Sequence, residues 1–140
     1  MWMLYAAGSA IAAALVSIFG KVGLREVDPT LATIVRGIVM GLLLVAAGFA
    51  LKKFNAPALS AIHGRAWLFI LLSAAAGAAS WVLYFTALKL GPAGGVAVID
   101  KMSVVLIIII AAFAFGEAFT LRSVAGVVLT IAGAALIVFK

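Results

Sequence analysis

Cysteine is absent from this sequence, histidine occurs once, and only four residues are acidic. Without cysteine, the chain can form neither a disulfide nor a thiolate metal site. The single histidine, His63, and a few scattered carboxylates supply neither a metal-ligand cluster nor a nucleophile paired with its base. We therefore expect no metal, no cofactor and no enzymatic activity.

Charge is also scarce, since charged residues make up 10% of the chain and hydrophobic residues 68%. A soluble domain is about half apolar and about a quarter charged, so water is excluded as the main solvent. The formal net charge is +6, but the basic residues lie singly or in pairs between apolar runs rather than on one stripe. Lipid headgroups and membrane topology explain such residues. We expect a lipid bilayer as the partner and no nucleic acid.

Five apolar runs are long enough to cross a membrane, which takes roughly 20 helical residues. They cover residues 3–22, 30–51, 66–88, 93–115 and 121–139. Asp28 and Pro29 predict a capped start for the second run, and Thr120 predicts a cap for the fifth. The sequence therefore predicts one all-α domain, residues 1–140, which forms an integral membrane bundle of five transmembrane helices.

Small and polar residues recur at spacings of three and four along the third run. They are Ser73, Gly77, Ser80, Tyr84, Ala87 and Gly91. Helices in lipid approach each other closely through such faces. The stripe mainly predicts helix packing, although the phenol of Tyr84 could also face a cavity.

Three ionisable residues, Arg36, Asp100 and Lys101, fall inside the predicted spans. Such residues are costly in lipid and mark either transport pathways or paired structural sites. Arg36 lies about 8 to 10 Å from the start of its helix and Asp100 about 10 to 12 Å from the start of its own. Both helices start on the same side of the membrane, so Arg36 can neutralise Asp100.

Neighbours on one helix point about 100° apart, so Asp100 and Lys101 are not expected to pair. That arrangement leaves Lys101 near the midplane without an acidic partner, where it can attract a carboxylate or phosphate or release a proton. Ser103 shares the face of Asp100 and can donate to its carboxylate. The alternative is a buried ion network that only fixes the helix register.

The orientation of the chain should follow the lysines and arginines of the short loops. These residues are Lys52, Lys53, Arg65 and Arg122 on one side, and Lys21, Arg25, Lys89 and Lys140 on the other. Each side has four, and Arg36 tips the total only to five against four. Insertion in both orientations would let two copies form an inverted repeat. A chance tie between small counts is the alternative explanation.

The stretch GEAFTLRSVAGVVLTIAGAALIV resembles the closing signature of the EamA repeat in the drug/metabolite transporter superfamily. The stretches VDPTLATIVRGIV and SWVLYFTALKLGPAGGVAVIDKMSVVL are similar to its short, single-repeat members, and residues 99–103 are the most specific part. The resemblance implies a five-helix unit that pairs as an inverted, antiparallel homodimer in a bacterial or archaeal cytoplasmic membrane. It adds six matching positions as candidate substrate-binding residues: Arg36, Trp81, Tyr84, Asp100, Lys101 and Ser103.

Three functions remain open at this point. The first is a carrier of a small polar metabolite, with a carboxylate among its candidate groups, that works as a homodimer by alternating access. The second is a scaffold or regulatory subunit of a larger membrane complex. The third is a cation exporter like the small multidrug resistance proteins, which rely on an acidic residue in the first span. Residues 3–22 contain no acidic residue, which argues against the exporter; we expect the carrier, with the scaffold or regulatory subunit as its alternative.

Overall fold

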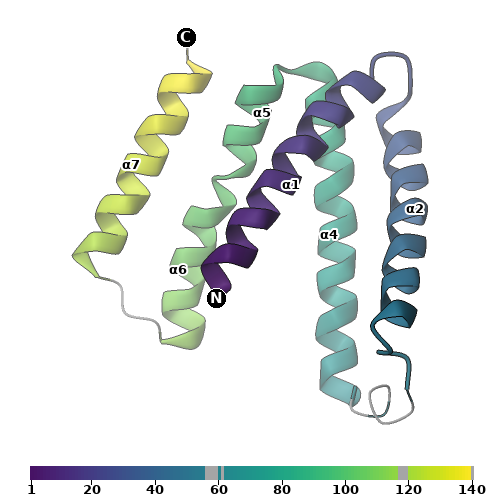
Figure 1. Ribbon diagram of the computed structural model, residues 1–140. Helices are drawn as coiled ribbons and strands as arrows, with labels where there is room; N and C mark the ends of the chain where they lie inside the picture. Colours follow the sequence, from purple (N-terminus) through teal and green to yellow (C-terminus); the bar gives the residue numbers. More distant parts are fainter. Residues whose placement is uncertain (56–59, 61, 117–119, 140) are drawn as a thin grey trace. The chain divides into compact units, whose positions relative to one another are not determined.

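The computed structural model describes residues 1–55, 60, 62–116 and 120–139, and these contain helices and no strand. The helices are α1 (Trp2–Gly23), α2 (Pro29–Ala50), α4 (Gly64–Leu90), α5 (Ala93–Asp100), α6 (Ser103–Phe115) and α7 (Leu121–Val138) (Figure 1). Because α5 and α6 share one apolar stretch, the described residues include five segments long and apolar enough to cross a membrane. This confirms the predicted all-α, five-span fold. Glu117 of the closing signature and Lys140 lie outside the described residues.

The predicted helix starts at Asp28 and Thr120 are confirmed. The Asp28 side chain accepts a hydrogen bond from the Leu31 N–H at 2.9 Å, and Pro29 occupies the first helical turn. The Thr120 hydroxyl accepts from the Ser123 N–H at 3.2 Å. Each cap satisfies an amide that has no partner within its own helix.

The fourth span is interrupted, whereas the sequence predicted one helix over residues 93–115. The Met102 N–H donates to the Ile99 carbonyl at 2.9 Å and the Val104 N–H to the Lys101 carbonyl at 3.0 Å. Both bonds reach back three residues instead of four, so a tight turn replaces the α-helical ladder here. The span therefore consists of two shorter helices, α5 and α6, that meet at Lys101 and Met102.

The chain divides into two compact units. Unit 1 comprises residues 1–21 and 90–140, and within it α7 packs along α5 and α6. Unit 2 comprises residues 22–89 and contains α2 and α4. In Figure 1, the start of α1 and the end of α7 lie at opposite ends of unit 1.

Few side chains are buried by the chain itself. The buried hydrophobic residues among those described are Leu24, Phe85, Leu88 and Ala111, while large apolar side chains are exposed along every long helix. A surface of this kind suits lipid or another apolar partner rather than water.

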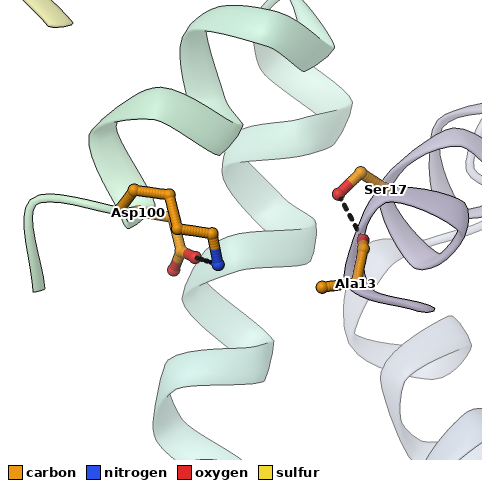
Figure 2. Close-up of polar contacts among 4 residues, drawn as sticks. Ala13, Ser17 and Asp100 are labelled. Carbon is orange, nitrogen blue, oxygen red and sulfur yellow. Dashed lines mark hydrogen bonds and ion pairs between the residues drawn. The ribbon is translucent and has the colours of Figure 1, made fainter. Parts of the chain in front are cut away.

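Hydroxyl groups within the helices donate to carbonyl oxygens one turn earlier. Ser17 donates to Ala13 at 3.0 Å (Figure 2), and Thr33, Thr86 and Thr130 make equivalent bonds of 2.7 to 2.8 Å. Because lipid offers no hydrogen-bond partner, these internal bonds let the hydroxyls lie within the membrane at little cost.

Candidate functional site

The interruption of the fourth span places two opposite charges next to each other in unit 1. Asp100 is the last residue of α5, and Lys101 follows it in the turn before α6. The Lys101 Nζ lies 3.5 Å from the Asp100 Oδ2, and Figure 2 shows this ion pair beside the Asp100 label. The charge pair and the break in the helix therefore coincide.

This ion pair corrects the expectation that Asp100 and Lys101 cannot pair and that Lys101 lacks an acidic partner. The expectation assumed a continuous helix, in which adjacent side chains diverge. The α-helix ends at Asp100 instead, and the flexible four-carbon stem of Lys101 lets its ammonium turn back to the carboxylate. Lys101 is therefore neutralised within unit 1.

Ser103 does not make the hydrogen bond to Asp100 that the sequence suggested. Ser103 is the first residue of α6, beyond the tight turn. A spacing of three residues brings side chains to one face only along an unbroken helix. Among the described residues of unit 1, no bond joins the Ser103 hydroxyl to the carboxylate.

The ion pair remains accessible in the single chain. The side chain of Lys101 is 61% exposed and that of Asp100 is 37% exposed. Charged groups at membrane depth normally face protein or a water-filled cavity rather than lipid. The pair therefore marks a surface that needs a polar or protein environment.

A second charged group lies in unit 2, where Arg36 of α2 stacks on aromatic rings of α4. The Arg36 Cζ is 3.2 Å from the centroid of the Trp81 ring and 5.2 Å from that of Phe85. Trp81 and Phe85 are four residues apart, so they lie on one face of α4, with ring centroids 5.8 Å apart. Figure 1 shows α2 and α4 running alongside each other, as this contact requires.

A hydrogen bond joins the end of α4 to the chain just before α2, and it fixes the depth of the Arg36–Trp81 stack. The Lys89 Nζ, near the end of α4, donates to the Val27 carbonyl, just before α2, at 2.8 Å. Arg36 is seven residues beyond the start of α2 at Pro29, or about 10 Å along the axis, and Trp81 is eight residues before Lys89, or about 12 Å. The Arg36 guanidinium therefore reaches sideways to α4, at the same depth as its own backbone, and does not extend toward the membrane surface.

The aromatic stack offsets only part of the cost of a cation at this depth. A cation–π contact contributes about 0.5 to 2 kcal/mol, whereas an arginine near the centre of a membrane helix costs at least about 2.5 kcal/mol. A guanidinium also has five N–H donors, and ring contact satisfies none of them. Within unit 2 as described, Arg36 has no ion-pair or hydrogen-bond partner.

The predicted site residues fall into two groups. Unit 2 brings Arg36 and Trp81 together, and the Tyr84 ring contacts Phe85, with the two ring centroids 5.9 Å apart. Unit 1 brings Asp100 and Lys101 together. Phe85 was not among the predicted site residues, although its spacing of four from Trp81 was a usable signal. The Arg36–Asp100 pair stays a prediction.

Comparison with known proteins identifies the family of the chain. The model of a family described as the EamA-like transporter family matches residues 1–139. The chain belongs to this family. A protein of Sinorhizobium sp, named an uncharacterized transporter in the cobO 3' region, is 40% identical over 136 residues, which are 97% of this chain and 95% of that protein. No solved structure matches the chain. The predicted resemblance to the EamA repeat is confirmed.

Membership of the EamA-like transporter family, together with five apolar spans, makes this chain a multi-pass membrane protein of a transporter family. Among the described residues of this EamA-like protein, no cluster of three histidine, aspartate or glutamate side chains is placed to hold a metal ion. The chemistry that its two charged groups offer is ion pairing, cation–π contact and hydrogen bonding.

Proposed function

We propose that this protein is a carrier, not an enzyme, that moves a small polar metabolite by alternating access as an antiparallel homodimer. Its place is the cytoplasmic membrane of a bacterium or archaeon. The family and the transporter name of the Sinorhizobium relative support a transport function. The candidate site residues supply the polar contacts that such a cargo needs.

The observation that carries this proposal is the ion pair of Asp100 and Lys101 at the break between α5 and α6. Carriers commonly bind substrate and coupling ions where a membrane helix is discontinuous, because the turn frees backbone groups at depth. Here the N–H groups of Met102 and Val104 bond three residues back, so they do not reach the carbonyls of Val98 and Asp100. A polar cargo can exchange contacts with the ion pair and these carbonyls as the carrier changes state.

Exposure of the ion pair in the single chain supports a dimer. A lipid-facing Lys101 would be costly, whereas a second copy in the inverted orientation can enclose both ion pairs in one polar chamber. Lys52, Lys53 and the other loop cations are evenly divided between the two sides, which favours insertion both ways. Ser103 of unit 1 is a candidate contact at the wall of this chamber, and Tyr84 and Trp81 of unit 2 are further candidate substrate contacts.

A ligand screen with the Lys101→Met variant tests the carrier. We would screen amino acids, carboxylates and phosphate esters by thermal shift of the purified protein in detergent, and then measure uptake of each hit into proteoliposomes. Hits should shift the wild type and the control Lys53→Met, fail to shift Lys101→Met, and be taken up. Equal shifts in all three proteins would contradict the site, and binding without uptake would favour a scaffold or regulatory subunit.

The absence of cysteine makes the topology directly testable. Single cysteines at Glu26 and Asn55 would lie at opposite ends of α2, and neither substitution removes a basic residue. A membrane-impermeant maleimide should label about half of each variant from either face of the membrane if both orientations occur. Labelling of each cysteine from one face only would exclude dual topology.

A further inference from the structure

We propose that Arg36, stacked on Trp81, is the site where this protein binds an oxyanion, the carboxylate or phosphate group of its cargo. This inference rests on the proposed carrier function and names the class of its substrate. The sequence pointed to Lys101 as the cation that meets an anion. The structure instead directs the choice to Arg36, because Asp100 already neutralises Lys101.

The two cations differ in what an arriving anion would have to displace. An anion approaching Lys101 competes with a carboxylate 3.5 Å away on the adjacent residue. An anion approaching Arg36 displaces no acidic group of unit 2, since the contacts of the guanidinium there are the rings of Trp81 and Phe85. Arg36 therefore offers a full positive charge to a ligand.

The geometry of the stack suits recognition of a planar oxyanion. At 3.2 Å from the ring centroid, the flat guanidinium can fit only with one face against the indole. Its N–H groups point outward in its own plane, where they can form two parallel bonds to a carboxylate or phosphate. Stacking also limits the rotation of the side chain, so less freedom is lost when the anion binds.

The surroundings of the stack provide both rigidity and an apolar wall. Phe85 is buried, and the Lys89–Val27 hydrogen bond holds the ends of α4 and α2 together. Trp81 and Phe85 also keep water from one side of the guanidinium, which strengthens a charge-assisted bond on the other side. An oxyanion could come from a soluble metabolite or from a lipid phosphate, and the experiment separates these sources.

Trp81 itself is the probe for the experiment, because anion binding to Arg36 changes the charge next to the indole. Replacing Trp2 and Trp67 with phenylalanine leaves Trp81 as the only tryptophan. Acetate, succinate and inorganic phosphate would be titrated at constant ionic strength into this single-tryptophan protein in neutral detergent. We expect a saturable change in Trp81 emission with at least one of the three anions.

Variants of Arg36 show whether the response belongs to this site. Arg36→Gln should weaken the apparent affinity about tenfold or more, because it removes charge-assisted hydrogen bonds. Arg36→Lys keeps the charge but not the bidentate geometry, so an intermediate loss of anion affinity is expected. It also serves as the second variant if Arg36→Gln does not fold. Arg65→Gln removes an equal charge from the exposed start of α4 and should bind like the parent.

Three results would overturn the inference: no emission change with any soluble anion, an equal response in the Arg36 variants, or a response only when nanodiscs contain phosphatidylglycerol in place of phosphatidylcholine. The last result would assign the site to a lipid phosphate. Uptake in proteoliposomes is measured separately with the screened hits. Uptake that persists without anion binding at Arg36 would contradict this inference alone. Anion binding at Arg36 without uptake of any hit would contradict the carrier proposal.

Discussion

In unit 1, the adjacent Asp100 carboxylate neutralises Lys101 where the fourth span is interrupted. In unit 2, Arg36 of α2 stacks instead on the Trp81 indole of α4, and both of these helices are unbroken. The ion pair has no net charge, so it needs a polar or protein environment but no further counterion. The stack keeps a charge of +1, so it still needs an acceptor. The difference shows that one cation in a membrane span can be neutralised by an adjacent carboxylate while another keeps its charge against an aromatic ring.

The largest expected effect is on the ion pair. Lys101→Met leaves the Asp100 carboxylate without its counterion in a membrane span, so we expect a loss of about 2 kcal/mol in the free energy of unfolding and loss of transport. The double variant Asp100→Asn/Lys101→Met leaves no uncompensated charge and should recover at least half of that stability. Unfolding in mixed detergent micelles measures the stability of both variants and of Asp100→Asn alone. If the double variant lost the sum of the two single losses, the result would contradict the ion pair.

The matching substitution in unit 2 should have a smaller effect on stability. Arg36→Met removes a cation that has no acidic partner in its unit, and the removed cost of the charge offsets the lost stacking energy, so the free energy of unfolding should fall by less than about 1 kcal/mol or rise. Transport should still fall about tenfold or more. A loss as large as that of Lys101→Met would mean that Arg36 has an acidic partner, and would favour the predicted Arg36–Asp100 pair.

The spans were predictable from sequence because their signals are local. Each apolar run is long enough to cross a bilayer, and Asp28 and Thr120 cap the helices that directly follow them. The break at Lys101 and Met102 was not predictable in this way. Neither residue is a helix breaker, and the nearest glycine and proline lie earlier, at positions 91 to 95.

The site was only partly predictable, because partners of buried charges depend on tertiary placement. Arg36, Asp100 and Lys101 were identifiable, since each is an ionisable residue in an apolar run. Which of them paired could not be derived from helical spacing once the fourth span proved discontinuous. Phe85 was missed because a phenylalanine in an apolar helix resembles any other packing residue.

The two units end a helix with the same left-handed backbone conformation but with different residues, glycine in unit 1 and lysine in unit 2. In unit 1, this predicts a change of about 1 kcal/mol in the free energy of unfolding. Gly116 ends α6 with a φ of 65°, a left-handed conformation that costs a residue with a side chain about 1 to 2 kcal/mol. Gly116→Ala should therefore lower the free energy of unfolding by about 1 kcal/mol. Gly126→Ala, within α7 and with open space around the added carbon, should be neutral or slightly stabilising. Equal effects of the two changes would contradict this account.

In unit 2 the same backbone conformation occurs at a lysine, so substitution should have the opposite sign. Lys52 ends α2 with a φ of 53°, and its N–H and that of Lys53 bond the carbonyls of Phe49 and Gly48, a pattern that usually places glycine at this position. Lys52→Gly relieves the left-handed strain but adds freedom to the unfolded chain, so we expect a net gain of about 0.5 kcal/mol, measured by unfolding in mixed micelles. Lys53→Gly removes the same charge at a residue without positive φ and should bring no gain. If both variants gained equally, relief of charge repulsion rather than backbone geometry would explain the result, and the contrast with Gly116→Ala would no longer hold.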